Sequence, residues 1–257
     1  MNPVARITAL AAIGLAAGFL SGLFGVGGGI LIVPALVLIL GFPQKLATGT
    51  SLVAIAPISL VGVVSYLVQG NVDWLVGGCI AVGMVAGGAL GSWLLHRLHT
   101  TVIAWIFIVV ILGVAIRMFF EDPARGIPDA LEVWEYFALL GFGVVAGVLS
   151  GLVGVGGGII IVPSLIVFFG IGDLVAKGAS LVAMIPNAVT TSVQNLRRRN
   201  ADLAAGLTIG VAGSGTSVLG SLCAAWVDPR TGSILFGIFL LIVSAQLIWR
   251  HVRRRTR

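Results

Sequence analysis

The chain has 257 residues, of which 58% are hydrophobic and only 9% are charged. A soluble domain carries roughly 25% charged residues, so this composition excludes a water-soluble globular protein and predicts an integral membrane protein. The net charge of +6 owes much to a basic tail at residues 250–257, which directly follows an apolar segment. Such a tail is typical of a cytoplasmic flank held near anionic lipid headgroups, and we expect no nucleic-acid partner.

Ten apolar segments follow one another along the chain, five in each half. In the first half we expect them at about 7–23, 29–41, 46–69, 74–95 and 101–119. In the second half we expect them at about 134–152, 158–170, 175–195, 203–225 and 231–249. A full span needs about 20 residues, and the second segment of each half is shorter. The first two segments of each half are therefore either two thin spans or a re-entrant hairpin broken at the glycines, and both alternatives return the chain to the same side.

Two copies of one motif mark the halves as a duplication. Residues 18–36 read GFLSGLFGVGGGILIVPAL, and residues 147–165 read GVLSGLVGVGGGIIIVPSL. Fifteen of these 19 positions are identical at a constant offset of 129 residues. Self-similarity at a fixed offset indicates an internal repeat. The same offset aligns a G-x-S-L motif that begins at Gly49 and Gly178, and an N-x-D motif that begins at Asn71 and Asn200.

The loops predict the orientation of the chain. Arginine and lysine gather in alternate loops, at Arg6, Lys45, Arg97, residues 197–199 and the tail. Most acidic residues lie in the opposite set of loops, to which Asp173 and Lys177 are also assigned. Positive residues prefer the cytoplasmic side, so we expect a multi-pass protein of the cell inner membrane with both termini in the cytoplasm. Because five segments is an odd number, the second half enters the membrane inverted relative to the first, as in many secondary transporters.

The expected fold is therefore an all-α membrane protein built from two inverted-topology repeats. Residues 1–120 form the N-terminal transmembrane repeat, residues 121–133 an external linker, and residues 134–257 the C-terminal transmembrane repeat with its basic cytoplasmic tail. We expect broken or re-entrant helices at the glycine-rich motifs of both repeats.

The glycine-rich runs are the strongest local signal. Four glycines in five residues, as in 25–29 and 154–158, cannot make a stable continuous helix. Broken helix at membrane depth is tolerated where it is buried in protein or lines a cavity, and the amide groups at the start of a half-helix attract an anion. Glycines also let membrane helices pack closely, so packing alone is the alternative. The candidate substrate-binding glycines are Gly25, Gly27, Gly28, Gly29, Gly154, Gly156, Gly157 and Gly158.

Polar groups and prolines near the runs are further candidates. A helical serine often bonds its own backbone, and a buried amide acts as an interhelical bond or as a substrate ligand. Proline inside a helix frees a carbonyl and kinks the helix, which makes it either a fixed kink or a hinge. The candidate substrate-binding polar residues are Ser21, Ser51, Ser150, Ser180 and Asn187. The candidate hinge or kink residues are Pro34, Pro57, Pro163 and Pro186.

The doubled G-x-x-S-G-x-x-G-V-G-G-G motif, each copy followed by a proline, together with the downstream G-x-S-L and N-x-D motifs, resembles the sulfite exporter TauE/SafE family of membrane transporters. The resemblance covers essentially the whole chain. One departure separates the halves, because residues 47–51 read ATGTS and residues 176–180 read AKGAS. The matching residues are Gly22, Gly25, Gly27, Gly28, Gly29 and Pro34, and Gly151, Gly154, Gly156, Gly157, Gly158 and Pro163.

The resemblance implies a secondary transporter for small anions, in particular sulfur-containing ones such as sulfite or sulfoacetate, in the direction of export. The alternatives are an anion channel, or a transporter of a cation, a metal or another small solute. All nine carboxylates fall in loops or at segment ends, which disfavours a cation path. We expect no enzyme activity, no cofactor and no metal site. The expected partners are a small anionic substrate and the lipid bilayer, with a homodimer as an open alternative.

Overall fold

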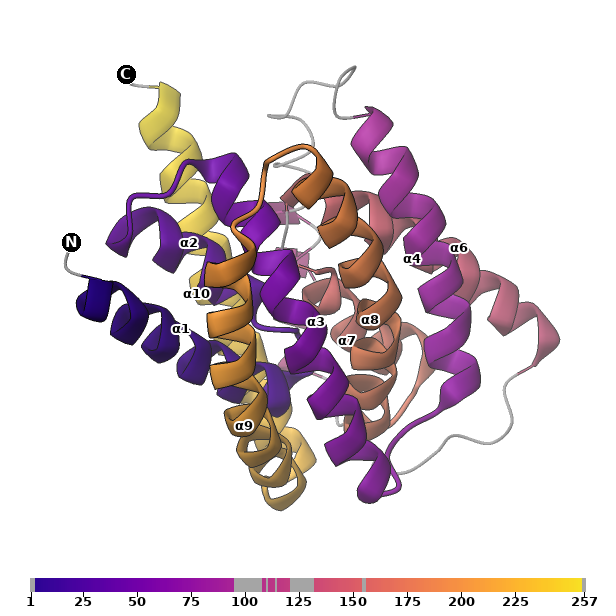
Figure 1. Ribbon diagram of the computed structural model, residues 1–257. Coiled ribbons are helices and arrows are strands. Elements are labelled where there is room, and N and C mark those ends of the chain that lie inside the picture. The colour runs from indigo at the N-terminus through magenta and orange to yellow at the C-terminus, as the bar shows by residue number, and fades with distance from the viewer. Residues whose placement is uncertain are drawn as a thin grey trace.

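The computed structural model describes residues 3–94, 108–109, 111–113, 115–120, 132–153 and 156–255 (Figure 1). Much of the predicted segment 101–119, most of the linker 121–133 and the candidate Gly154 lie outside these residues. The described helices lie close to the predicted segments, and the described residues form no strand. The helices are α1 (Pro3–Phe24), α2 (Gly29–Ile39), α3 (Gln44–Val68), α4 (Trp74–Leu94), α6 (Val133–Val153), α7 (Gly158–Phe169), α8 (Asp173–Arg197), α9 (Leu203–Trp226) and α10 (Pro229–Arg255).

Six of the described helices, namely α1, α3, α6, α8, α9 and α10, are long and apolar enough to cross a membrane. The helices α2 and α7 have only 11 and 12 residues. At about 1.5 Å per residue, each reaches roughly half of a hydrocarbon core that is about 30 Å thick. The prediction of an all-helical, multi-pass protein is therefore confirmed, and α2 and α7 are too short to cross alone.

The two halves of the chain pack on each other throughout the bundle. The helices α3 and α8 lie side by side at its centre (Figure 1). On either side of them α1 packs along α9 and α4 packs along α6, while α9 also contacts α3 and α4 also contacts α8. At the offset of 129, α1 is equivalent to α6, α3 to α8 and α4 to α9. The contact of α1 with α9 therefore corresponds to that of α6 with α4, and the contact of α3 with α9 corresponds to that of α8 with α4.

Stripes of glycine bring the outer helix pairs into backbone contact. A Cβ on Gly18 would overlap the backbone of Gly213 in α9, and a Cβ on Gly147 would overlap the carbonyl oxygen of Met84 in α4. Gly18 is equivalent to Gly147, and Met84 to Gly213, so the two contacts correspond. Small residues four apart let membrane helices approach this closely. The stripes consist of Gly14, Gly18 and Gly22 in α1, and of Gly143, Gly147 and Gly151 in α6.

The repeated G-x-S-L and N-x-D motifs contact each other across the halves. A Cβ on Gly49, near the start of α3, would overlap the carbonyl oxygen of Asn200, which follows α8. A Cβ on Gly178, near the start of α8, would overlap the carbonyl oxygen of Asn71, which follows α3. Each of these two equivalent helices thus begins where the other ends. The helices α3 and α8 therefore run antiparallel.

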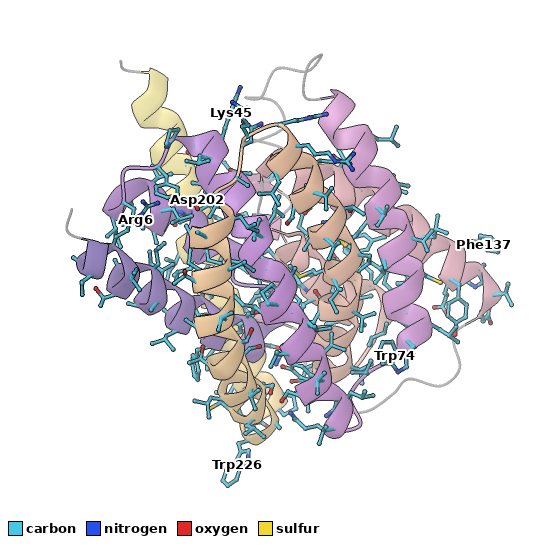
Figure 2. All side chains as sticks on the ribbon, in the orientation of Figure 1. Arg6, Lys45, Trp74, Phe137, Asp202 and Trp226 are labelled. Atoms are coloured by element: carbon cyan, nitrogen blue, oxygen red, sulfur yellow. The ribbon has the colours of Figure 1, made fainter. Side chains whose placement is uncertain are left out.

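The two ends of the bundle expose different side chains (Figure 2). Arg6 and Lys45 lie in the upper part of the view, where Arg6 donates to Asp202 at 2.9 Å. Trp74 and Trp226 lie toward the bottom and are 55% and 90% exposed. We call these the basic end and the tryptophan end. Tryptophan prefers the boundary between water and hydrocarbon, so the tryptophan end fits one surface of a membrane.

Candidate functional site

The glycine-rich runs break the helices where the sequence predicts. The helix α1 ends at Phe24 and α2 begins at Gly29, and between them Gly25, Gly27 and Gly28 have φ of +70°, +74° and +72°. Residues other than glycine rarely adopt this left-handed backbone conformation, whereas glycine adopts it freely. We call this segment the first glycine turn, residues 25–28.

The second half has an equivalent break between α6 and α7. Gly156 and Gly157 have φ of +86° and +87°, and α7 begins at Gly158. We call these residues, together with Gly158, the second glycine turn. Every described residue of the two turns is buried, so the site is closed to solvent in this conformation.

The two glycine turns meet inside the bundle. A Cβ on Gly158 would lie 2.7 Å from the Cα of Val26 and 2.9 Å from the carbonyl oxygen of Gly25. The side chains of Ile55 in α3 and Met184 in α8 both lie against Gly27 of the first turn and against Gly156 of the second. Ile55 and Met184 are themselves equivalent at the offset of 129. The two glycine-rich runs, which lie 129 residues apart in the sequence, are therefore in contact in the described residues.

Two short helices begin at this meeting point. The N-cap residues are Gly28 for α2 and Gly157 for α7, and neither supplies a side-chain hydrogen bond to its helix. The first amide groups of a helix have no partner within the helix, and the aligned peptide dipoles give this end a partial positive charge. Both helix starts therefore present the electrostatics that suit an anion.

The hydroxyl of Ser180 in α8 holds the first glycine turn against that helix. Ser180 donates to the carbonyl oxygen of Gly25 at 2.9 Å across the two halves. Its equivalent Ser51 donates to the carbonyl oxygen of Thr48 at 2.8 Å within α3. Both serines are fully buried. Ser180 therefore positions the turn in this conformation, and the sequence alone did not predict that contact.

The serines that precede the two runs have different surroundings. Asn187 in α8 donates to the hydroxyl of Ser150 at 3.1 Å, which joins α8 to α6. The hydroxyl of the equivalent Ser21 is buried without a hydrogen-bond partner among the described residues. The reason is visible in the sequence, because Ile58 stands in α3 where α8 has Asn187. The first half thus leaves a hydroxyl available where the second half uses one for packing.

All four candidate prolines lie inside helices, at Pro34 in α2, Pro57 in α3, Pro163 in α7 and Pro186 in α8. Proline removes an amide donor and clashes with the preceding turn. The described helices thus place all four prolines where a kink is predicted. Whether they kink these helices or act as hinges stays a prediction.

One pair of charged residues that the sequence assigned to an external loop lies inside the protein. Asp173 is the first residue of α8 and Lys177 follows one turn later, and their side chains are only 4% and 6% exposed. The lysine Nζ lies 3.3 Å from the aspartate Oδ2. The loop assignment was wrong because a charge near a segment end was taken to be solvated. The AKGAS departure at residues 176–180 was the signal that marked this region as different.

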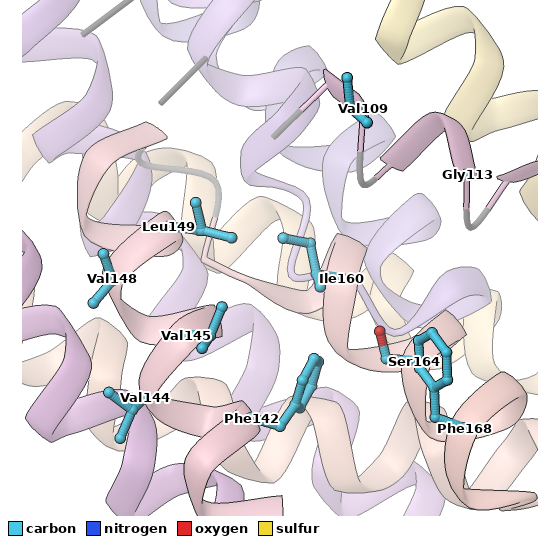
Figure 3. Close-up of a pocket in the computed structure, with 10 residues that line it drawn as sticks. All are labelled: Val109, Gly113, Phe142, Val144, Val145, Val148, Leu149, Ile160, Ser164 and Phe168. Atoms are coloured by element: carbon cyan, nitrogen blue, oxygen red, sulfur yellow. The ribbon is translucent and has the colours of Figure 1, made fainter. Parts of the chain in front are cut away.

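An apolar recess of about 540 Å³ is lined by residues of α6 and α7 together with Val109 and Gly113, and its lining residue Ile160 lies two residues after Gly158 of the second glycine turn (Figure 3). Ser164 supplies the only hydroxyl among its described lining residues. An anion needs donors or positive charge in a site of low polarity, so this recess does not fit the predicted substrate. Its lining residues are Val109, Gly113, Phe142, Val144, Val145, Val148, Leu149, Ile160, Ser164 and Phe168.

The long apolar helices, joined to short helices through breaks that meet inside the bundle, define an integral membrane protein of the transporter class. The sequence profile described as Sulfite exporter TauE/SafE matches residues 2–129 and 139–257. The chain therefore belongs to the sulfite exporter TauE/SafE family of membrane transporters.

Three similar proteins carry the name "Probable membrane transporter protein". YunE of Bacillus subtilis is 38% identical over 110 residues, which cover 43% of this chain and 40% of YunE. A protein of Methanocaldococcus jannaschii is 32% identical over 159 residues, covering 60% of this chain and 59% of that protein. YdhB of Bacillus subtilis is 28% identical over 224 residues, covering 85% of this chain and 87% of YdhB. The match thus spans less than two thirds of the first two proteins and most of the third.

Proposed function

We propose that the chain is a secondary transporter that moves small sulfur-containing anions, such as sulfite or a sulfonate, out of the cell. The observation that carries the proposal is the meeting of two glycine-broken helix starts inside the bundle. The helices α2 and α7 begin there without side-chain caps, and their amide groups and dipoles favour an anion. The family description supplies the sulfur oxyanion class.

Within this site we assign substrate contact to the backbone amides of the two glycine turns and to the hydroxyl of Ser21. Ser21 is fully buried, and its hydroxyl has no hydrogen-bond partner among the described residues. Ser180, Ser150 and Asn187 already bond within the protein. We assign to them the role of holding α6, α8 and the first turn in the closed conformation, from which the site opens to bind substrate.

We further infer that the two repeats, residues 1–120 and 134–257, lie inverted in the membrane. Two observations support this arrangement. The helices α3 and α8 run antiparallel, and the other major contacts between the halves come in equivalent pairs, such as α1 with α9 and α6 with α4. The short helices α2 and α7 then serve as the returning limbs of re-entrant pairs, with the glycine turns near mid-membrane. The basic end faces the cytoplasm by the positive-inside rule.

This topology predicts that both termini lie in the cytoplasm while the linker between the repeats lies outside. A reporter enzyme that is active only in the cytoplasm, fused after Arg257, is expected to be active, and the same reporter inserted at residue 129 is expected to be inactive. A reporter active only outside the cytoplasm serves as the reciprocal control. An external signal at the C-terminus contradicts the inverted-repeat arrangement.

The anion is expected to carry its negative charge across the membrane, because no proton or cation is transported with it. While Asp173 and Lys177 remain paired they add no net charge, and the glycine turns bind through amides that do not exchange protons. A negative interior supplies roughly 2.3 kcal/mol per charge per 100 mV to drive an anion outward. In proteoliposomes, flux of radiolabelled sulfite or sulfoacetate is therefore expected to follow an imposed potassium diffusion potential.

The control for this measurement is a pH gradient imposed without a potential, corrected for protonation of the substrate itself. Flux is expected to be insensitive to it. Flux that follows the pH gradient and ignores the potential contradicts electrogenic export and makes Asp173 the group to examine as a proton carrier.

A further inference from the structure

The buried pair Asp173–Lys177 has no explanation in the packing of the bundle. Both side chains are more than nine-tenths buried, and a 3.3 Å contact joins them. Removing two charges from water costs more than such a contact returns, and apolar residues usually stabilise a fold as well or better. A charged pair that does not serve stability is a candidate for function, above all inside a membrane protein.

The first half of the chain shows that the architecture does not require the pair. At the offset of 129, Gln44 stands in place of Asp173 and Thr48 in place of Lys177. The helices α3 and α8 otherwise correspond from their first residue to their last. An uncharged pair is therefore accommodated at the equivalent position of the same fold.

Lys177 belongs to the candidate site by its position. A Cβ on Gly25 would lie 2.7 Å from the Cα of Lys177 and 3.1 Å from its Cγ, so the lysine lies directly against the first glycine turn. Ser180, about one turn further along α8, donates to the carbonyl oxygen of Gly25 at 2.9 Å. The helix α8 therefore presents a hydroxyl and an ammonium-bearing side chain to the same turn.

The partner carboxylate is incompletely satisfied. The Oδ1 atom of Asp173 is buried and has no hydrogen-bond partner among the described residues. The nearby Tyr66 does not supply a donor, because its hydroxyl donates to the carbonyl oxygen of Gly22 at 2.6 Å. A buried carboxylate with one oxygen lacking a hydrogen-bond donor is less well stabilised than a carboxylate with both oxygens hydrogen-bonded. The carboxylate of Asp173 is thus an ion-pair partner of Lys177 that another anion can replace.

We propose that Lys177 binds the substrate anion, and that Asp173 takes the place of the anion in the empty transporter. This rests on the proposed transport of anions and adds the residue that neutralises the substrate. A sulfur oxyanion accepts a charge-assisted hydrogen bond from an ammonium as a carboxylate does. When the substrate binds, Asp173 at the start of α8 moves to water at the tryptophan end, where the structure places that helix start beside Asn71.

The test is equilibrium binding of radiolabelled sulfite to the purified full-length protein. Lys177→Gln is expected to weaken binding about tenfold to a hundredfold, because a charge-assisted hydrogen bond is lost. Asp173→Asn is expected to strengthen binding severalfold, because the competing carboxylate is removed. Lys177→Arg, which keeps the charge, is expected to retain most of the affinity. The two members of one ion pair thus have effects of opposite sign.

The matched control is the double variant Asp173→Gln with Lys177→Thr, which copies Gln44 and Thr48 of the first half. It leaves no unpaired buried charge, so it is expected to fold like the parent protein and to bind as weakly as Lys177→Gln. Arg6→Gln removes the exposed ion pair of the basic end, whose side chains are 47% and 27% exposed, and is expected to leave binding unchanged.

Two outcomes overturn the inference while the proposed function stands. The first is unchanged sulfite binding in the folded double variant. The second is an equal loss of binding in Asp173→Asn and Lys177→Gln that the double variant restores, which assigns the pair a purely structural role. Failure of the wild-type protein to bind sulfite, thiosulfate or sulfoacetate contradicts the proposed function itself, and this inference with it.

Discussion

Replacement of Gly28 by valine is expected to abolish transport in a protein that still inserts into the membrane. Gly28 has φ of +72°, which a β-branched residue rarely adopts. A Cβ there would also lie 2.7 Å from the carbonyl oxygen of Ala17, a backbone atom that cannot easily move. The change therefore alters the start of α2, where the proposed anion binds. Initial rates of sulfite flux in proteoliposomes measure the effect.

The equivalent change Gly157→Val is expected to have the same sign but a smaller size. The φ of +87° is equally unfavourable, yet the nearest atom, at 2.7 Å, is the flexible end of Met84. Gly41→Val is the matched control, because φ is +67° and no atom lies within 4 Å of the added Cβ. It carries the same backbone strain outside the glycine turns. Wild-type flux in folded Gly28→Val protein counts against a central role for the turns.

Gly143→Ala in α6 is expected to destabilise the fold markedly, whereas Gly141→Ala in the same helix is not. A Cβ at position 143 would lie 2.5 Å from the carbonyl oxygen of Ile80 and 3.0 Å from its Cα, so α4 must move away. Overpacking of this kind costs about 1–3 kcal/mol. Nothing lies within 4 Å of a Cβ at position 141. Alanine there is expected to stabilise the helix by up to about 1 kcal/mol relative to glycine.

Thermal unfolding of the two purified variants in the same detergent measures this difference. Both substitutions add one methyl group to α6 two residues apart, so effects of composition and expression cancel. A lower unfolding temperature for Gly143→Ala alone is the expected result. Equal unfolding temperatures mean that the α4–α6 contact does not limit stability, and contradict a stabilising role of the glycine stripes.

The sequence predicted the positions of the helices and of the helix breaks well, because both depend on local composition. Apolar runs set the helices, and the glycines at 25–28 could not continue α1 whatever surrounds them. The offset of 129 likewise revealed the duplication. It did not reveal that Gly49 contacts Asn200 while Gly178 contacts Asn71. Such contacts join segments about 150 residues apart or about 107 residues apart, and they depend on how the two halves are placed in space.

The site was harder to predict than the fold. Ser180 was named as a candidate, but its bond to Gly25 crosses the halves and has no local signature. Lys177 and Asp173 were placed in a loop because charge patterns report the side of the membrane and not the depth of burial. The different partners of Ser21 and Ser150 follow from one substitution, Ile58 against Asn187. The effect of this substitution on the two serines can be recognised only when it is known that α8 packs next to Ser150 of α6.

The exchange of partners between the halves has a consequence for biosynthesis. Gly18 of α1 packs on Gly213 of α9, which lies 195 residues later in the chain. At about 5–20 residues per second, α9 is synthesised roughly 10–40 s after α1 enters the membrane. During that time the glycine face of α1 has only lipid or the insertion machinery as a neighbour. The first half therefore emerges from the ribosome before α9 and α6, the helices that pack most extensively on α1 and α4, have been made.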